Sequence, residues 1–189
     1  MTRLDEALAA TDRSHYWHDD AVQPQIRHTT PTELIAAMLE LLDPEPGQRV
    51  LEIGTGSGFS TALLARLVGA DGLVVSLDVD TQMTERAGRV LVADGVANVV
   101  LRRADGRTAD AEHAPYDRII SWAQADRAVP TPWVEQIRPG GIVVSPVRKE
   151  GRAEVIRYRA EGGGLVEDGS LRAGFDPLTA EPWRPWLTE

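Results

Sequence analysis

The residues best suited to chemistry are three glycines, Gly54, Gly56 and Gly58, which follow an apolar stretch at 50–53 and precede a helical pattern at 59–68. Glycine allows the backbone to approach a ligand closely. A helix N-terminus presents unpaired amides and a partial positive charge, so it can hold an anion. The pattern therefore predicts a buried strand, a ligand-binding turn and a helix in succession.

The spacing of these glycines argues against two common phosphate-binding motifs. A dinucleotide fingerprint reads G-x-G-x-x-G, whereas this chain reads G-x-G-x-G and carries Phe59 where the third glycine would fall. No lysine follows the glycines, so the turn is not a P-loop. Glu52 would repel a pyrophosphate, but a carboxylate at a mostly buried strand end wants a cationic partner, such as a ligand's ammonium group.

These features favour S-adenosylmethionine, whose methionine portion carries an ammonium group, as the ligand of the turn. The alternative is a tight turn that binds no ligand. The residues of the strand end and the turn that we assign to this cofactor site are Glu52, Gly54, Thr55, Gly56, Ser57 and Gly58.

Two further acidic residues follow predicted strands. Asp78 ends the apolar stretch 73–78, and it stands twenty positions beyond Gly58. In a parallel sheet this offset places its carboxylate at the tip of the neighbouring strand, where it can accept both ribose hydroxyls of an adenosine. The alternative is an aspartate that merely precedes a turn. We include Asp78 and the following Val79 in the cofactor site.

Asp105 and Gly106 follow the third predicted strand, at 98–101. An acidic residue and a glycine at this strand tip can meet the amino group of adenine, so both join the predicted cofactor site. Taken alone, such a pair is more often an ordinary turn.

The helix that precedes the glycine turn has a well-marked beginning. Apolar residues recur on one face of the stretch 31–42. Thr30 is the predicted N-cap, Pro31 the first helical residue and Glu33 the returning carboxylate of a capping box.

The remaining pattern alternates strands with helices, which implies a mostly parallel, doubly wound α/β sheet with ligands at the carboxyl ends of its strands. Near the end of the chain, stretches at 154–160 and 165–167 flank a glycine turn and predict an antiparallel sheet edge. The other predicted elements are strands at 117–122 and 142–147, a helix at 81–93, and a helix that starts at 131 and is closed by 139–141.

Composition limits the classes of function. The chain has 189 residues, enough for one domain with a sizeable core, and a formal net charge of −9, which argues against nucleic acid as the main partner. It has no cysteine, so disulfides, thiolate catalysis and cysteine zinc sites are excluded. The N-terminus is too polar for a signal peptide and no apolar run reaches membrane-spanning length. We expect a soluble, cytoplasmic monomer.

The stretch 15–20, which reads H-Y-W-H-D-D, crowds potential metal ligands together. No regular element aims them at one point, so the favoured interpretation is an aromatic lid or a segment that faces the substrate. We assign no metal site.

A series of motifs from about residue 28 onward resembles the protein-L-isoaspartate (D-aspartate) O-methyltransferase family, within the class I S-adenosylmethionine-dependent methyltransferases. The glycine turn alone is shared by the whole superfamily. The more specific motifs are D-G-R at 105–107, A-P-Y-D at 114–117, V-P at 129–130, E-Q-I-R-P-G-G at 135–141, V-S-P-V at 144–147, F-D-P-L-T at 175–179, and the tryptophans 183 and 186.

The resemblance implies a Rossmann-like class I methyltransferase domain at 30–189, preceded by an N-terminal segment at 1–29 that is a candidate substrate lid. It implies that the three glycines hold the methionine end of the cofactor, Asp78 the ribose, and Asp105 with Gly106 the adenine. Thr179 would place a hydroxyl near the amino-acid end of the cofactor.

The chain departs from the family at the catalytic serine, which the family carries in an S-x-P segment. Here the segment reads H-T-T-P at 28–31, so either Thr29 or Thr30 matches, and Thr30 has the alternative role of N-cap. The family also has more residues before this point, which help to hold the isoaspartyl peptide, and it usually has glutamate where this chain has Asp78.

The implied activity is carboxyl O-methylation of L-isoaspartyl residues in proteins or peptides. A carboxylate is already an anion at pH 7, so no general base is required, and a hydroxyl from Thr29 or Thr30 would orient it. Methylation of an aspartate in a dedicated precursor peptide is a close variant. The alternatives are a tRNA adenine methyltransferase, for which Arg102, Arg103 and Arg107 form the only tight basic cluster, and a non-catalytic module that binds S-adenosylmethionine.

Overall fold

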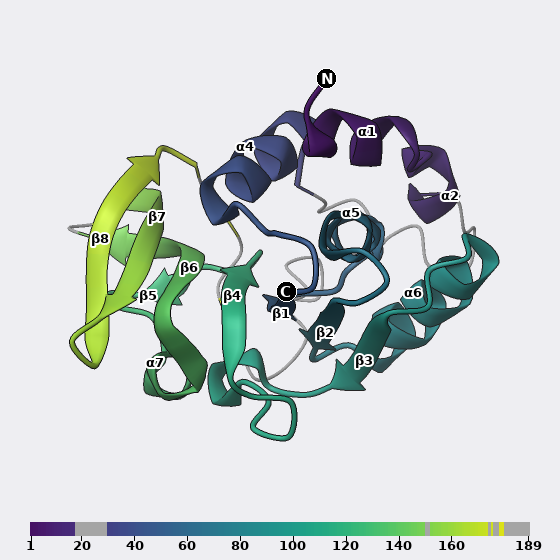
Figure 1. Cartoon of the computed structure of the whole chain (residues 1–189). Coiled ribbons are helices and arrows are strands. Elements are labelled where there is room, and N and C mark those ends of the chain that lie inside the picture. The colour runs from purple at the N-terminus through teal and green to yellow at the C-terminus, as the bar shows by residue number, and fades with distance from the viewer. Residues whose placement is uncertain (18–29, 150–151, 174, 176–177, 180–189) are drawn as a thin grey trace.

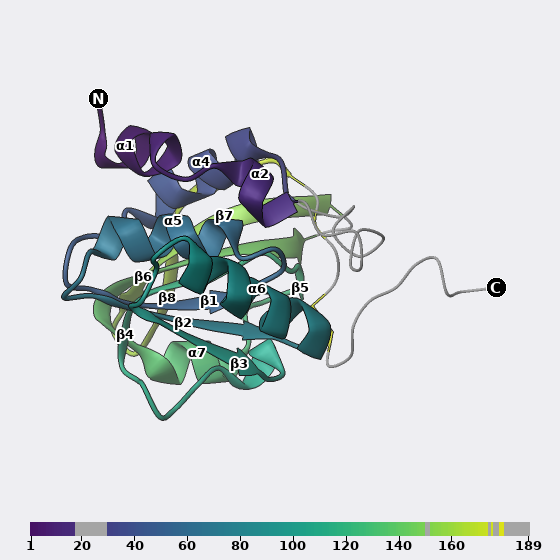
Figure 2. The same cartoon turned by 90° about the vertical axis from the view of Figure 1, so that its right-hand side faces the viewer.

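A computed structural model describes residues 1–17, 30–149, 152–173, 175 and 178–179 of the chain, and it shows one sheet flanked by helices (Figures 1 and 2). The sheet order is β3-β2-β1-β4-β6-β7-β8, and β5 pairs with β6 beside this path. The strands are β1 (Arg49–Ile53), β2 (Leu73–Asp78), β3 (Val99–Arg103), β4 (Tyr116–Ser121), β5 (Ala125–Asp126), β6 (Ile137–Lys149), β7 (Arg152–Glu161) and β8 (Gly164–Leu171).

The pairings among β1, β2, β3, β4 and β6 are parallel, whereas β7 and β8 complete the sheet in antiparallel pairs. This arrangement confirms the predicted α/β class and the antiparallel C-terminal edge. The turn between β7 and β8 uses Gly162 and Gly163 at positive φ (60° and 81°), as the glycine run predicted.

Helices cover both faces of the sheet unequally. The helices α4, α5 and α6 pack on one face, with α1 and α2 outside them, whereas α7 and the short 3₁₀ helix η1 lie on the other face (Figures 1 and 2). Their bounds are α1 (Arg3–Ala9), α2 (Arg13–Trp17), α4 (Thr32–Leu42), α5 (Phe59–Val68), α6 (Thr81–Ala93), η1 (Gly106–Thr108) and α7 (Thr131–Gln136). Among the described residues, no helix has both the length and the apolar character that a membrane crossing requires.

The strands supply a separate core to each face because successive side chains of a strand point to opposite sides. Val50 and Val74 pack into the core beneath α4 and α5, whereas their neighbours Leu51 and Val75 pack into the core that contains Trp133 of α7. Burial on both faces explains why apolar residues stand at successive positions in these strands.

The predicted start of α4 is wrong by one residue. Pro31, not Thr30, occupies the N-cap position, with an extended backbone (φ −55°, ψ 147°) and no side-chain cap. Its carbonyl accepts the amides of Leu34 and Ile35 at 3.1 and 3.0 Å. Proline fixes φ and disfavours helical geometry in the residue before it, so Thr30 stays outside the helix.

The predicted closure by 139–141 of the helix that starts at 131 is also only partly right. The helix α7 ends at Gln136, but the chain enters β6 immediately, at Ile137, which pairs with Tyr116. The register then shifts, so that Ile142 is the partner of Arg118. The glycines of this stretch therefore accommodate an irregularity inside a long strand instead of a separate loop.

Gly106 offers a test of the close packing beneath the carboxyl end of β1. A Cβ at Gly106 would lie 2.2 Å from Cγ2 of Ile53, so Gly106→Ala should lower the free energy of unfolding by about 1–3 kcal/mol. Urea unfolding measures this loss. The control is Gly88→Ala in α6, where the new Cβ would be 3.5 Å from Leu101 and should stabilise the helix by about 0.5–1 kcal/mol. An unchanged urea midpoint for Gly106→Ala would contradict the packing argument.

Candidate active site

The glycine turn between β1 and α5 is held in a conformation that favours glycine. Gly54, Gly56 and Gly58 all have positive φ, at 95°, 50° and 87°. The Gly54 amide donates to the carbonyl of Leu77 at 2.7 Å, and the Gly56 amide donates to the carboxylate of Asp78 at 2.9 Å. The turn is therefore fastened to the end of β2.

A pocket of about 180 Å³ opens above this turn, at the carboxyl ends of the central parallel strands. It contains six of the residues assigned from the sequence, namely Thr30, Gly54, Thr55, Gly56, Ser57 and Asp78. It also contains five that the sequence analysis did not assign, namely Arg13, Ile35, Phe59, Ser60 and Trp122. The position of the site at this sheet edge is the one expected for α/β folds.

Asp78 connects the turn to the next loop. One carboxylate oxygen accepts the Gly56 amide and the other accepts the Asp80 amide, both at 2.9 Å. Burial raises the pKa of this carboxyl above its ordinary value, although both amides favour the ionised form. Each oxygen can still accept a further hydrogen bond, so the carboxylate can receive a pair of hydroxyl groups from a ligand.

The argument that Glu52 needs a cationic partner is wrong. The side chain is fully buried, and neutral groups surround its carboxylate. One oxygen accepts from the Ser60 hydroxyl at 2.6 Å and the Trp122 indole N–H at 2.8 Å, and the other accepts from the hydroxyls of Thr61 and Ser76 at 2.5 and 2.7 Å. Glu52 is not in the pocket lining, and it acts on the pocket through Ser60 and Trp122.

Burial also raises the pKa of Glu52, because the cost of removing the charged form from water outweighs the effect of its hydrogen-bond donors. The donors themselves come from three places in the chain, α5, β2 and the residue after β4. The carboxylate therefore joins the elements that surround the pocket.

Asp105 and Gly106 lie outside the pocket lining. The Asp105 carboxylate caps η1 and forms an ion pair with the guanidinium of Arg107 at 2.6 Å, which lowers the pKa of Asp105. Gly106 packs against Ile53, and its carbonyl accepts the indole N–H of Trp133 at 2.7 Å. The structure thus gives both residues a structural role beside β1.

Val79 and Gly58, two further residues predicted for the site, are not in the pocket lining. Val79 follows Asp78 outside the pocket lining, and its carbonyl accepts Nε of Arg103 at 3.4 Å. Gly58 is the N-cap of α5 and would crowd Ala87 at 3.1 Å if it carried a Cβ. Thr29 lies outside the described residues.

Thr179 lies beside the loop that follows β4, because its neighbour Leu178 is hydrogen-bonded to that loop. The Leu178 amide donates to the carbonyl of Gln124 at 2.8 Å, so the chain at Thr179 runs close to the loop after β4. Thr179 is half-buried and is not in the pocket lining.

Arg13 is a pocket residue that the sequence analysis missed. Its guanidinium donates to the Thr30 carbonyl at 2.8 Å and to the Thr32 hydroxyl, and it lies 5.2 Å from the centre of the Phe59 ring. The helix α2 that carries it has only five residues, which is too short for a detectable periodicity, so no sequence pattern indicates its role. Arg13 fixes the segment before α4 over the glycine turn.

Trp122 and Ser60 were detectable from their positions. Trp122 directly follows β4 at the carboxyl edge of the sheet, and Ser60 is in the first turn of α5. Both positions are typical of ligand-binding residues in parallel sheets.

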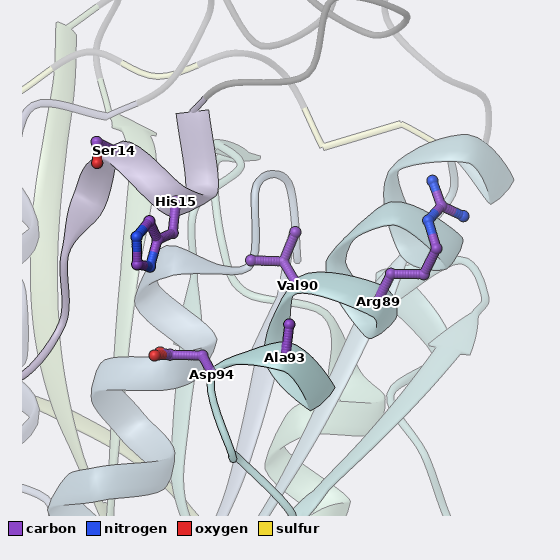
Figure 3. A pocket seen from close by; sticks show the side chains of 6 residues that line it. All are labelled: Ser14, His15, Arg89, Val90, Ala93 and Asp94. Atoms are coloured by element: carbon purple, nitrogen blue, oxygen red, sulfur yellow. The ribbon is translucent and has the colours of Figure 1, made fainter.

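A second pocket, of about 730 Å³, lies between α2 and α6 and shares no lining residue with the first (Figure 3). His15 of α2 lies beside Val90 and above Asp94 in this view, and Asp94 is paired with Arg66 at 2.7 Å. His15 therefore lines a helix–helix groove, and the other charged residues of the stretch 15–20 lie outside the described residues.

The described residues also contain one group that could hold a metal ion, formed by Asp110, Glu112 and His113. Arg102 already pairs with Asp110 at 3.4 Å and with Glu112 at 2.5 Å. A guanidinium therefore supplies the positive charge there, and we assign no metal site to the group.

The parallel sheet in the order β3-β2-β1-β4, with a glycine turn after β1 and an acidic residue at the tip of β2, defines a Rossmann-like methyltransferase of class I. Comparison with known families agrees. The sequence model of the protein-L-isoaspartate(D-aspartate) O-methyltransferase family matches residues 2–181. The chain belongs to this family.

Individual relatives support the same assignment. A protein-L-isoaspartate O-methyltransferase of Anaeromyxobacter dehalogenans strain 2CP-1 is 41% identical, over 95% of this chain and 90% of the relative. A protein-L-isoaspartate O-methyltransferase 1 of Archaeoglobus fulgidus is 45% identical over 77% of this chain and 66% of the relative.

Solved structures show the same fold. A protein-L-isoaspartate O-methyltransferase with 27% identity superposes with a TM-score of 0.82, covering 94% of this chain and 61% of the other. A Plasmodium falciparum structure, described as a complex of such an enzyme with S-adenosyl-L-homocysteine, has 17% identity and a TM-score of 0.81, covering 96% and 92%.

The network around Glu52 predicts a particular pH dependence of stability. Because burial raises its pKa in the folded state, Glu52 contributes most stability at low pH and loses it as the pH rises above the ordinary carboxyl value through the raised one. Glu52→Gln removes this titration and places an amide donor among donors, at a cost of about 1–3 kcal/mol.

The free energies of unfolding of wild type and Glu52→Gln, measured in urea from pH 4.5 to 8, should therefore converge as the pH rises. Glu40→Gln on the exposed side of α4 controls for the loss of one carboxyl group. A difference that widens with pH would disprove the raised pKa.

Proposed function

We propose that this protein is an S-adenosylmethionine-dependent carboxyl O-methyltransferase that acts on L-isoaspartyl residues of proteins or peptides. The observation that carries the proposal is the family match over residues 2–181 together with 41% identity over 95% of the chain. The pocket at the glycine turn supplies a binding place with suitable donors and acceptors.

The proposed cofactor pose follows the order of the strands. The Asp78 carboxylate at the tip of β2 receives the ribose hydroxyls, and the turn Gly54–Gly58 receives the methionine portion with Thr55 and Ser57 beside it. The adenine then lies toward β3, beside Val79, Asp105 and Gly106. The Asp105 carboxylate is already paired with the Arg107 guanidinium. To bind adenine, it must either accept from the adenine amino group as well or release Arg107.

The bound cofactor supplies a methyl group on a positively charged sulfur. One oxygen of the acceptor carboxylate forms a bond to the methyl carbon while the carbon–sulfur bond breaks, and its electron pair remains on sulfur. No proton moves in this step, so the protein's task is to align the acceptor and to exclude water. We assign the alignment to a hydroxyl of Thr29 or Thr30, assisted by backbone amides of the stretch 121–125. Within this stretch the amides of Trp122 and Ala123 already donate to the Ile53 carbonyl and the Ser121 hydroxyl.

Thr30 fits this role better than its predicted capping role. It lines the pocket, it does not cap α4, and its carbonyl is fixed by Arg13. The position of Glu52 fits an indirect role, in which it fixes Ser60 and Trp122 and does not contact the cofactor's ammonium group. The proposed role of Thr179 is to close the site at the amino-acid end of the cofactor.

Isoaspartyl residues of damaged proteins are the favoured acceptor, and an aspartate of a dedicated precursor peptide is the close variant. The proposed working unit is a monomer. The proposed location is the cytoplasm, where the acceptor proteins are made.

The structure weakens the tRNA alternative. The basic cluster at Arg102, Arg103 and Arg107 is largely neutralised, because Arg102 pairs with Asp110 and Glu112 and Arg107 pairs with Asp105. Phosphate binding depends on cations that can release counterions, and paired arginines do this poorly.

Methyl transfer from labelled S-adenosylmethionine tests the proposal directly. We expect label on an isoaspartyl peptide, and we expect neither a matched peptide with ordinary aspartate nor tRNA to be labelled at a comparable rate. The methyl ester should be released by mild alkali, since it is a carboxyl ester. Labelling of the aspartyl peptide alone would favour the precursor-peptide variant. Cofactor binding without transfer to any acceptor would favour a non-catalytic module.

Removal of both candidate hydroxyls should reduce the rate. The double variant Thr29→Val/Thr30→Val should lower kcat/KM for the isoaspartyl peptide by about 10- to 100-fold, the value of a hydrogen bond to a charged group. Affinity for the cofactor should be nearly unchanged. Thr84→Val, which removes a hydroxyl that donates to the carbonyl of Asp80, the N-cap of α6, is the control. A double variant as fast as wild type would exclude both threonines from alignment.

A further inference from the structure

Trp122 occupies a defined position on the wall of the pocket. Its backbone amide donates to the Ile53 carbonyl at 2.9 Å, so it continues the pairing of β4 with β1 beyond the end of the strand. A Cβ on Gly54 would lie 3.4 Å from Cβ and 3.9 Å from Cδ1 of Trp122, so the indole packs directly against the glycine turn. The side chain is half-buried and lines the pocket.

The orientation of the indole is fixed by a buried acceptor. Its Nε1–H donates to the Glu52 carboxylate at 2.8 Å, and the same oxygen accepts from Ser60. A ring that is held at its N–H edge and packed on one side offers a preorganised surface to a ligand. A carboxylate at the N–H also polarises the indole toward greater electron density in the ring.

The order of the strands indicates which part of the cofactor meets this ring. The strand order is β3-β2-β1-β4, and the ribose is assigned to Asp78 at the tip of β2. With the adenine toward β3, the group on the other side of the ribose must extend toward β1 and β4. In S-adenosylmethionine that group is the sulfonium, which is bonded to the 5′ carbon of the ribose. Two aromatic residues, Phe59 and Trp122, are among the described lining residues of the pocket. The Phe59 ring already has the Arg13 guanidinium 5.2 Å from its centre, whereas Trp122, directly after β4, lies where the sulfonium is expected.

We propose that Trp122 is a specificity-determining residue that recognises the positive charge of the sulfonium through the face of its indole. Tryptophan is the best aromatic partner for a cation, and recognition of weakly hydrated onium ions is a typical use of such rings. The assignment rests on the proposed use of S-adenosylmethionine as the methyl donor. It does not depend on the identity of the acceptor.

The charge changes during the reaction, and this gives the residue a role in turnover. The acceptor oxygen bonds to the methyl carbon, the carbon–sulfur pair returns to sulfur, and the product is a neutral thioether. Trp122 therefore attracts the donor and loses this attraction to the product S-adenosylhomocysteine, which favours exchange of product for donor.

The two nucleosides provide a sharp test, because they differ by one methyl group and one charge. Isothermal titration of the full chain should show that Trp122→Leu weakens S-adenosylmethionine about 2- to 30-fold more than it weakens S-adenosylhomocysteine. Trp122→Phe keeps an aromatic face, so its ratio of the two Kd values should fall between those of wild type and Trp122→Leu.

Trp133→Phe is the matched control. Trp133 also donates its indole N–H, to the Gly106 carbonyl at 2.7 Å, but it lies in the core on the other face of the sheet. Its replacement should change the affinities for both nucleosides by the same factor. Thermal unfolding of each variant verifies that it is folded. If Trp122→Leu does not fold, the conservative Trp122→Phe carries the test alone.

An unchanged ratio of the two Kd values in the Trp122 variants would overturn the inference and would leave Trp122 as a packing residue. Failure of wild type to bind either nucleoside would instead refute the proposed function. The two failures are therefore distinguishable.

Discussion

One buried carboxylate determines how the pocket is assembled. Glu52 lies at 0% exposure inside the molecule, where an ionisable group is costly unless hydrogen bonds satisfy it. Three hydroxyls and one indole do so. Because these donors belong to α5, β2 and the residue after β4, the interaction that compensates the burial also fixes the elements around the glycine turn. Removing any one donor would leave an acceptor partly unsatisfied in a place that water does not reach.

A second carboxylate works at the edge of the same turn but keeps capacity for a ligand. Each oxygen of Asp78 accepts one hydrogen bond, from the amide of Gly56 or of Asp80, and the residue lines the pocket. Glu52 and Asp78 thus have different roles. The hydrogen-bonding capacity of Glu52 is filled by protein donors, so Glu52 makes the site rigid. Asp78 keeps capacity to accept hydrogen bonds from a ligand, so it can recognise one. The difference follows from burial and from the number of donors around each group.

The sequence predicted the elements better than it predicted contacts between them. The bounds of β2 at 73–78 and of α6 at 81–93 agree with the structure, because apolar periodicity and the break at Gly72 are local signals. The class of fold and the position of the site followed from the order of these elements. The argument that Glu52 needs a cationic partner failed for a different reason. Its donors Ser60, Thr61, Ser76 and Trp122 are spread over the chain, and no local pattern indicates that they converge.

Local competition explains the other departures. Thr30 has the side chain of a good cap, but the fixed φ of Pro31 moves the helix start beyond it. Asp105 has the position of an adenine ligand, but Arg107, two residues away, reaches back to its carboxylate. Arg13 gave no signal because a five-residue helix has too few positions to show a period. For Thr30 and Asp105, one neighbouring residue outweighs a correct regional pattern.

The charges of the pocket fit a reaction between a cation and an anion. Among its described lining residues, Arg13 and Asp78 carry opposite charges, and backbone amides, hydroxyls and aromatic rings make up most of the rest. Amides and hydroxyls can orient a carboxylate without removing or adding a proton, and an indole can attract a sulfonium without competing as a nucleophile. Such a lining aligns the two reactants and leaves the bond exchange to them. Rigidity supplied by the network of Glu52 is then the property that the site most requires, because alignment is lost over displacements of about 1 Å.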